Sequence, residues 1–438
     1  MTDEKKQKDP REHVNIVFIG HVDAGKSTLG GQIMYSTGQV DDRTIEKYTR
    51  EAKEKNRDSW YLAFVMDCSE EEKEKGKTVH AARAHFETEK KRYTVIDAPG
   101  HKAYVPNMIG GASQADVAIL VISARRGEFE AGFEQGGQTR EHTMLAKTLG
   151  VERLIVVINK MDESTVQWSE ERYNEIVDKL TPYLKKLGFK SKAFQFLPVS
   201  GFTGANIKNP IDSHKCPWYK GPTFLDALDD LDPIERNESG PLRMPVIDKY
   251  KDRGTMVVLG KIETGTVRVD DKVLIMPSNK EVEVAAIKSH DIDVDEARPG
   301  ENVELHLKAD LHKDDVHSGY VICDLKNPVL PVKEFLAQFL VLDKALFTSG
   351  YSAIIHIHTA VEDVTVTALM ATLDKRTGKE ITKKPKFAKQ GDLLLVRMTL
   401  PQSVCITKFS DCPQLGRFTI REDKTVAVGK VTAIKPLK

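Results

Sequence analysis

An eight-residue loop near the N-terminus constrains this chain more than any other feature. Residues 20–27 read Gly-His-Val-Asp-Ala-Gly-Lys-Ser, with two glycines separated by four residues and followed by Lys and Ser. The apolar run at residues 14–19 predicts a buried strand, and residues 28–34 predict the first turns of a helix. In this strand–loop–helix context, backbone N–H groups and the helix start can together bind phosphate. The loop therefore predicts an α/β sheet with a phosphate site at one edge.

The side chains of this loop suit a polyphosphate bound together with a magnesium ion. We expect Lys26 to reach the outer phosphates and the Ser27 hydroxyl to bind Mg²⁺. A glycine-rich turn that matches the pattern by chance is the alternative, and it would not require the flanking strand and helix. The residues of the loop and helix start that we expect to bind the nucleotide are Val22, Asp23, Ala24, Gly25, Lys26, Ser27 and Thr28.

The segment at residues 93–101 predicts a second buried strand that ends near the same phosphates, in Asp-Ala-Pro-Gly-His. Asp97 is placed to hold Mg²⁺ through water, and Gly100 to give the γ-phosphate a backbone N–H and to act as a hinge. His101 is the expected catalytic residue, which orients the attacking water or stabilises charge during hydrolysis. A loop histidine with a structural hydrogen bond is the alternative.

A threonine upstream of that strand completes the expected metal site. Thr78 lies in Lys-Gly-Lys-Thr-Val after an acidic–basic run, and it is a candidate second hydroxyl on Mg²⁺ while the γ-phosphate is bound. A surface threonine without such a role is the alternative, and the order of the motifs along the chain favours the metal ligand. The expected ligands are Ser27, Thr78 and Asp97.

A later segment selects the base. The apolar run at residues 154–158 ends in Asn-Lys-Met-Asp. The carboxylate of Asp162 can accept the two N–H donors on the guanine edge, whereas adenine would leave that carboxylate buried and unpaired. The stem of Lys160 can lie over the base plane. The residues expected on the base side, including those after a third strand, are Asn159, Lys160, Asp162, Ser200, Gly201 and Phe202. A guanine nucleotide, GTP or GDP, is the predicted ligand.

These segments together resemble the translational GTPases, the group of elongation factor Tu and elongation factor 1-alpha. The shared marks are GHVDAGKST, the switch threonine, DAPGH and NKMD. Finer details are similar to one branch, the eukaryotic class II peptide-chain release factors. Those details are residues 75–79, 104–112, 123–142 and the Gly-Arg-Phe-Thr-Ile-Arg segment at 416–421. The resemblance runs from about residue 12 to the C-terminus.

The resemblance implies a function and partners. A member of this branch is expected to hydrolyse GTP on the ribosome in translation termination, with Mg²⁺ bound. It is expected to hold the class I peptide-chain release factor on its C-terminal barrel and to couple hydrolysis to stop-codon-dependent peptide release. Three alternatives stay open: a ribosome-rescue GTPase, an elongation factor that delivers aminoacyl-tRNA, and a non-catalytic scaffold gated by nucleotide.

Two features depart from the family pattern. Family members usually carry a long N-terminal extension, whereas only residues 1–12 precede the first strand here as a short polar tail. The contacts with poly(A)-binding protein that belong to the extension are therefore not assignable. In addition, Lys77 stands where elongation factor Tu has an Ile that pairs with the loop Val, here Val22. A charged stem cannot form the same apolar gate beside His101.

Composition limits the remaining possibilities. Lys plus Arg equals Asp plus Glu at 65 each, so bulk electrostatic binding to RNA or to an anionic membrane is not expected. A local basic patch at residues 382–389 is one candidate RNA contact, and a solvated hairpin loop is the alternative. The five cysteines form no CxxC pair, which fits a reducing cytosol. No apolar stretch approaches ~18 residues, so we expect no membrane contact and a cytoplasmic location.

Periodicity divides the chain into a multi-domain protein. Residues 13–235 alternate apolar runs with helical patterns and predict an α/β P-loop GTPase domain. After a linker rich in Pro, Asn, Ser and Gly, short strands with Gly and Asp turns predict two all-β barrel domains, at residues 241–328 and 331–438. In the last of these, His356 and His358 are expected on one strand face, as a structural pair rather than a metal site.

Overall fold

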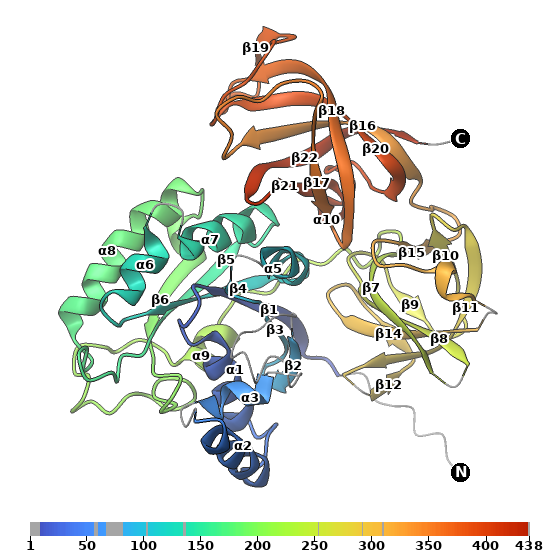
Figure 1. The fold of residues 1–438 in the computed structure, drawn as a ribbon. Coiled ribbons are helices and arrows are strands. Elements are labelled where there is room, and N and C mark those ends of the chain that lie inside the picture. The colour runs from blue at the N-terminus through green and yellow to red at the C-terminus, as the bar shows by residue number, and fades with distance from the viewer. Residues whose placement is uncertain are drawn as a thin grey trace, which may run out of the picture. The chain divides into compact units, whose positions relative to one another are not determined.

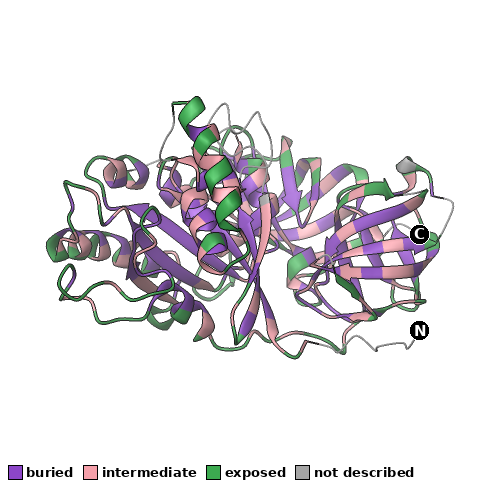
Figure 2. Cartoon of the chain, turned by 90° about the horizontal axis from the view of Figure 1, so that it is seen from below, coloured by how far each residue is buried: buried purple, intermediate pink, exposed green. Residues whose placement is uncertain are grey.

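The computed structural model describes residues 9–56, 60–66, 82–101, 104–134, 137–252, 254–290, 292–308 and 311–436. The chain divides into two compact units, Pro10–Ile234 and a second unit built from Glu235 onward. Figure 2 shows that the strands of both units are largely buried, whereas exposed residues gather on loops and on the outer faces of helices.

The first unit is built on a six-stranded sheet with the strand order β2-β3-β1-β4-β5-β6 (Figure 1). Strand β2 is antiparallel to β3, and the other neighbours run parallel. The strands are β1 (Glu12–Gly20), β2 (Ala82–Glu87), β3 (Lys91–Asp97), β4 (Val117–Ser123), β5 (Arg153–Asn159) and β6 (Phe194–Pro198). Because β1, β3, β4 and β5 are parallel, their carboxyl ends meet at one edge, where ligands bind in sheets of this kind.

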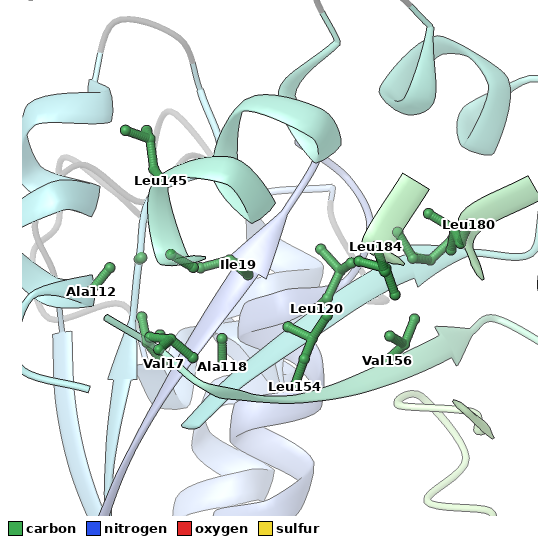
Figure 3. Packing of buried hydrophobic residues seen from close by; sticks show 14 of the residues in the cluster. Val17, Ile19, Ala112, Ala118, Leu120, Leu145, Leu154, Val156, Leu180 and Leu184 are labelled. Atoms are coloured by element: carbon green, nitrogen blue, oxygen red, sulfur yellow. The ribbon is translucent and has the colours of Figure 1, made fainter. Parts of the chain in front are cut away.

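Helices cover both faces of this sheet, which is why its strands read as continuous apolar runs. Successive side chains of a strand point to opposite faces, so Val17 and Ile19 of β1 pack in one hydrophobic cluster and Ile16 and Phe18 in another. The first cluster includes Leu145, Leu180 and Leu184 from two helices (Figure 3). The helices are α1 (Lys26–Ser36), α2 (Asp42–Glu54), α3 (Ala63–Met66), α5 (Val105–Ala112), α6 (Glu128–Phe133), α7 (Gln138–Thr148), α8 (Glu170–Lys186) and α9 (Phe224–Asp229), with a 3₁₀ turn at Ser191–Ala193.

Local chemistry sets the helix ends. Helix α2 begins after Asp41, whose carboxylate accepts the Thr44 N–H at 2.9 Å, and α8 begins after Ser169, whose hydroxyl accepts the Arg172 N–H at 3.2 Å. Such caps satisfy backbone donors that have no partner inside the helix. Helix α7 ends just before Gly150, which adopts a φ of 99°, a conformation that glycine takes without steric cost.

Two closed barrels make up the second unit. The first has the order β10-β15-β7-β8-β14-β11-β12 and closes through β10–β11 pairing. Its strands are β7 (Arg243–Asp252), β8 (Thr255–Lys261), β10 (Lys272–Met276), β11 (Lys280–Ser289), β12 (Ile292–Val294), β14 (Asn302–Lys308) and β15 (Val321–Asp324), with a small ladder of β9 (Val267–Arg268) and β13 (Glu296–Ala297) and a 3₁₀ turn at Lys313–Asp315.

The second barrel has the order β17-β21-β22-β16-β20-β18-β19 and closes through β17–β18 pairing. Its strands are β16 (Pro331–Val341), β17 (Tyr351–Ile357), β18 (Ala360–Leu373), β19 (Glu380–Lys383), β20 (Leu393–Cys405), β21 (Arg417–Arg421) and β22 (Thr425–Pro436), with the short helix α10 (Pro413–Gly416). Strand β17 ends at Ile357, so His358 lies in the following turn with a φ of 43°. The expectation that both histidines share one strand face is therefore wrong.

A buried apolar cluster joins the two barrels within this unit. It contains Leu274, Met276, Val321 and Cys323 from the first barrel, Cys405, Cys412 and Leu415 from the second, and Val329 from the connection. Burial of such side chains contributes about 25 cal/mol per Å² of apolar area, which makes the barrels one compact body.

The predicted α/β domain followed by two all-β barrels is confirmed. Strand β1 begins at Glu12, so it takes in the last residue of the predicted tail. The exact domain limits, 13–235, 241–328 and 331–438, stay a prediction. Among the residues that the structure describes, no helix has both the length and the hydropathy needed to cross a bilayer.

Candidate functional site

The loop between β1 and α1 turns tightly across the edge of the sheet. Gly25 adopts a φ of 87°, and a Cβ there would lie 2.5 Å from Asn159 Nδ2. A Cβ on Gly100 would lie 2.4 Å from Lys26 Nζ and 3.1 Å from the Val22 nitrogen. Neither position has room for a larger residue, so the two glycines bring backbone N–H groups and Lys26 close together.

Lys26 is the buried cation of this loop. Its side chain is 7% exposed, and Nζ donates to the carbonyl oxygens of His21 at 2.8 Å and Gly20 at 3.3 Å. Burial lowers the pKa of Lys26 to about 8, against the opposing effect of Asp97 and Asp23. An anion at the mouth of the loop would give this ammonium group the countercharge that burial makes it need.

Helix α7 supports the loop from behind. The Val22 N–H donates to Gln138 Oε1 at 3.2 Å, and the Gly20 N–H donates to His142 Nδ1 at 3.4 Å. Both side chains are buried. Burial together with Lys26 lowers the pKa of His21 in the same loop, although a hydrogen bond with Gln138 opposes the shift. Sequence reasoning missed Gln138 and His142. Their i,i+4 spacing on a helix was the available signal, because polar residues at that spacing share one face.

The serine and aspartate expected at the metal lie together. Ser27 Oγ donates to Asp97 Oδ2 at 2.6 Å, where β3 ends beside the start of α1. Asp97 is fully buried. A hydroxyl and a carboxylate are the hard oxygen ligands that Mg²⁺ prefers, so this donor set fits the ion. Thr78, the third expected ligand, and Lys77 lie outside the described residues.

Gly100 and His101 follow Asp97 after two residues, and Gly100 lies next to the phosphate loop. Gly100 is buried against Lys26 and Val22, whereas His101 is partly exposed. The imidazole ring lies 5.8 Å from the ring of Tyr104, between centroids. His101 therefore stands at the wall of the site, where its side chain can reach a bound molecule and solvent.

Asn159 joins three segments of the base side. Its Nδ2 donates to the Ala24 carbonyl at 2.9 Å, and its Oδ1 accepts the N–H groups of Lys160 and Gly201, each at 2.8 Å. The side chain is 2% exposed. Asn159 therefore fixes the phosphate loop, the Asn-Lys-Met-Asp segment and the Ser-Gly segment to one another, and all its polar atoms are committed to protein partners.

An ion pair holds the lysine of the same segment. Lys160 has a φ of 61°, and its Nζ lies 2.8 Å from Glu128 Oε2 at the start of α6. Burial raises the pKa of Glu128, but hydrogen bonds from Lys160 and Ser123 outweigh this effect and lower it. Arg125 lies 3.3 Å from the second oxygen of Glu128. The carboxylate thus stays ionised and keeps the lysine stem along the wall of the site.

These segments enclose a cavity of about 660 Å³ at the carboxyl edge of the sheet. This volume falls in the usual range for sites of small molecules and cofactors. The predicted residues that line it are Val22, Asp23, Gly25, Lys26, Ser27, Thr28, Gly100, His101, Asn159, Lys160, Asp162 and Phe202. Four other predicted residues of the described part of the chain do not line it and are buried: Ala24, Asp97, Ser200 and Gly201.

Sequence reasoning did not assign five residues that also line the cavity, Trp60, Ala63, Arg125, Glu128 and Glu163. Arg125 and Glu128 follow β4, so their position at the carboxyl end of a parallel strand was the available signal. Trp60 and Ala63 carried no such signal, because they lie in a short apolar stretch that follows no strand and matches no loop motif.

The family models match the whole arrangement. The elongation factor Tu GTP binding domain matches residues 11–233, elongation factor Tu domain 2 matches residues 256–323, and the GTP-eEF1A C-terminal domain-like family matches residues 334–432. The fold and the cavity thus define a GTPase of the translation-factor class.

Two relatives are similar along almost the whole chain. Both are named eukaryotic peptide chain release factor GTP-binding subunit. The one from Dictyostelium discoideum is 53% identical over 98% of this chain and 78% of its own length, and the one from Schizosaccharomyces pombe is 52% identical over 97% and 64%. The chain belongs to the family of eukaryotic peptide chain release factor GTP-binding subunits. The predicted family is confirmed. Its members are GTPases of translation termination, as the sequence predicted.

A solved structure at lower identity has the same fold. The GTPase-like domain of Saccharomyces cerevisiae Ski7, solved with GTP bound, has a TM-score of 0.78 and 18% identity, covering 96% of this chain and 97% of that one. At this identity the likeness concerns the fold alone, an α/β domain followed by two barrels.

Proposed function

We propose that the α/β unit binds GTP or GDP together with Mg²⁺ and hydrolyses GTP. The observation that carries this proposal is the single cavity lined by the phosphate loop, by Gly100 and His101, and by Lys160 and Asp162. These residues come from three distant parts of the sequence. A phosphate loop, a γ-phosphate sensor and a base-reading carboxylate are the three parts that a guanine nucleotide hydrolase requires.

At one end of the site, positive groups of the protein bind the negatively charged phosphates. Lys26 neutralises the outer phosphates, and the backbone N–H groups of residues 22–28 surround them. The nucleotide contacts of this loop come from Val22, Asp23, Ala24, Gly25, Ser27 and Thr28. Ser27, Asp97 and Thr78 hold the metal, which when bound neutralises charge on the β- and γ-phosphates.

Hydrolysis depends on His101. Its imidazole orients the attacking water in line with the γ-phosphate, and the Gly100 N–H donates to a γ-phosphate oxygen. The partial exposure of His101 supports this role, because the ring has room to turn toward the phosphate. Without an activator the water is poorly placed, so hydrolysis by the isolated protein is slow.

The base end of the site selects guanine. Asp162 is exposed at the cavity wall and accepts the two N–H donors of the guanine edge. The stem of Lys160, held by Glu128, lies along one face of the base. Ser200, Gly201 and Phe202 close the other side, and Asn159 holds all these segments in place.

The nucleotide state controls a partner in translation termination. In the GTP state Thr78, through Mg²⁺, and Gly100, through its N–H, sense the γ-phosphate, and its loss releases the two switch segments. The C-terminal barrel holds the class I peptide-chain release factor, and hydrolysis on the ribosome lets that partner settle into its productive pose. This activity takes place in the cytoplasm, where translating ribosomes are found.

Binding of the purified chain to the class I release factor in the presence of GTP, and separately of GDP, tests this function. We expect tighter binding with GTP and a weaker complex with GDP. The ribosome-rescue paralogue of the class I factor serves as the matched comparison. Tighter binding to the paralogue would assign the chain to ribosome rescue, and protection of aminoacyl-tRNA against hydrolysis would assign it to elongation. Equal binding with both nucleotides would contradict the proposed switch.

A further inference from the structure

The end of the last barrel carries an unbalanced group of cations. The chain as a whole has equal numbers of acidic and basic residues. Between β18 and the start of β20, however, residues 374–389 contain seven Lys or Arg and two Asp or Glu. The seven are Lys375, Arg376, Lys379, Lys383, Lys384, Lys386 and Lys389. We name these residues and Phe387 the basic tip. It projects from one end of the barrel with β19 (Figure 1).

The basic tip is exposed, and its charges are not neutralised by the protein. Residues 375–384 are all exposed, including every residue of β19. In the described part of the chain, none of its seven cations forms an ion pair. Lysines of the first barrel contrast with this: Lys272, Lys280 and Lys308 lie 3.3, 3.6 and 2.6 Å from carboxylate oxygens. The excess positive charge is therefore confined to the basic tip and does not extend to these lysines of the first barrel.

The backbone of the basic tip is well held, so the cations form a defined surface. The Asp374 carboxylate accepts N–H groups from Arg376 at 3.0 Å and Thr377 at 2.7 Å, which closes the turn after β18. The Asp374 carboxylate therefore binds backbone N–H groups of the turn rather than a lysine of the basic tip. Farther along, Ala388 and Phe347 exchange two backbone hydrogen bonds of 2.8 Å. Lysines on a fixed backbone lose less conformational freedom when they bind phosphates.

An aromatic ring lies among these lysines. Ala388 is buried, and its neighbours Phe387 and Lys389 point the other way, because successive residues of an extended segment alternate. Phe387 is 50% exposed, and Lys389 Nζ lies 5.9 Å from its ring centroid. A cation next to an exposed ring matches a nucleotide, which carries a phosphate next to a flat base.

We propose that the basic tip binds single-stranded RNA, with the lysines on phosphates and Phe387 stacked on an unpaired base. Duplex RNA would use the lysines but would offer no base for the ring. An acidic protein segment would use the charge but would gain no specific benefit from the aromatic side chain.

Two variants of the full chain separate the two kinds of contact. The first, Lys383→Gln with Lys384→Gln and Lys386→Gln, removes three cations. The second, Phe387→Leu, keeps the apolar character and removes the aromatic ring. The matched control for charge is Lys272→Gln with Lys280→Gln and Lys308→Gln, which makes the same change in net charge on the first barrel. Urea unfolding, measured for every variant, reports whether the barrels are intact, and GTP affinity, which depends on the other unit, is expected to stay unchanged.

The measurement is fluorescence anisotropy of a labelled oligouridylate RNA over a range of salt from about 50 to about 200 mM. We expect the triple lysine variant to flatten the slope of log affinity against log salt by about two, because each contacted phosphate of a single strand contributes about 0.7. We expect Phe387→Leu to weaken binding about tenfold with the slope unchanged. The first-barrel control should bind like the unchanged chain.

Several outcomes would overturn the proposal. One is equal loss of RNA affinity in the first-barrel control, which would mean that net charge alone acts. Another is an RNA duplex or polyglutamate that binds as tightly as the oligouridylate, because either would remove the role of the unpaired base. A third is a Phe387→Leu variant with undiminished affinity.

Discussion

At the scale of single residues, Lys26 is a cation that the fold removes almost completely from water. A buried ammonium group of this kind favours a bound anion. Its ammonium group rests on the carbonyl oxygens of Gly20 and His21, which carry only partial charge. The carboxylates of Asp97 and Asp23 compensate burial only in part, since the pKa still falls to about 8. Phosphate oxygens in contact with Nζ would restore the charged form.

Binding of GTP should therefore take up a proton at alkaline pH. At pH values above about 8, part of the free protein carries neutral Lys26, and contact with phosphates raises its pKa again. Calorimetry in buffers of different ionisation enthalpy measures this uptake. We expect it to approach one proton at about pH 9 and to vanish at about pH 7, where Lys26 is charged before and after binding. Uptake that does not change with pH would contradict the contact.

His101→Ala should abolish most of the ribosome-stimulated hydrolysis of GTP. Loss of a group that orients water or transfers protons typically costs about 10²- to 10⁴-fold in rate. Nucleotide affinity should stay the same within about twofold, because the ring is not expected to contact ground-state phosphates. The exposed His214, replaced by Ala, is the matched control. Unchanged turnover in the His101 variant would assign the histidine a structural role only.

Asp162→Asn should change the base that the site prefers. An amide at this position presents one donor and one acceptor, which suits xanthine and mispairs with guanine. We expect GTP affinity to fall by about 10²-fold or more and XTP affinity to rise, as measured by competition against a fluorescent nucleotide. Asp178→Asn on the exposed face of α8 is the control. If the base preference of the Asp162 variant matched that of the control, the carboxylate would not read the base.

At the scale of elements, strand–loop–helix units were predictable and the contacts between elements were not. The apolar run of β1 and the glycines after it fix a strand and a turn by local chemistry alone. Gln138 and His142 reach the loop only because α7 packs on the sheet through Leu145 and Ala146. That packing depends on residues more than a hundred positions apart, and no local pattern encodes it.

The turn after β17 shows the same limit in the last barrel. Alternation predicts His356 and His358 on one face, but the φ of 43° at His358 turns its side chain away from the strand pattern. Its Nε2 hydrogen-bonds the Cys405 carbonyl at 2.9 Å instead. Burial lowers the pKa of both histidines to about 4, with Arg421 as a further cause for His356. Both therefore stay neutral in the folded barrel.

This barrel should lose stability in mild acid. Between about pH 6.5 and 4 the unfolded chain binds protons at both histidines and the folded barrel does not. The free energy of unfolding therefore decreases as the pH is lowered through this range. The difference in pKa corresponds to about 3 kcal/mol for each histidine. Urea unfolding of the chain at several pH values measures it. His358→Gln should flatten the dependence and His214→Gln should not, and equal slopes in both would contradict this account.

At the scale of the whole molecule, the sequence predicted the arrangement of one unit better than that of the other. In the described part of the α/β unit, the phosphate loop, the Asp-Ala-Pro-Gly-His segment and the Asn-Lys-Met-Asp segment lie at the carboxyl edge of one sheet, so the order of motifs predicted the cavity. The barrels carry no such motif, and the apolar cluster that joins them includes Cys323, Cys405 and Cys412. Small apolar residues in separate segments of the chain gave no sign of a shared interface. The two barrels thus belong to one compact unit.

The central claim is that the cavity of the α/β unit is a site for guanine nucleotides. Calorimetric titration of the purified chain with GTP, GDP and ATP tests it most directly. The account predicts saturable binding of GTP and of GDP, and no measurable binding of ATP, because Asp162 finds its two donors only on guanine. Binding of ATP as tight as that of GTP, or no binding of either guanine nucleotide, would contradict it.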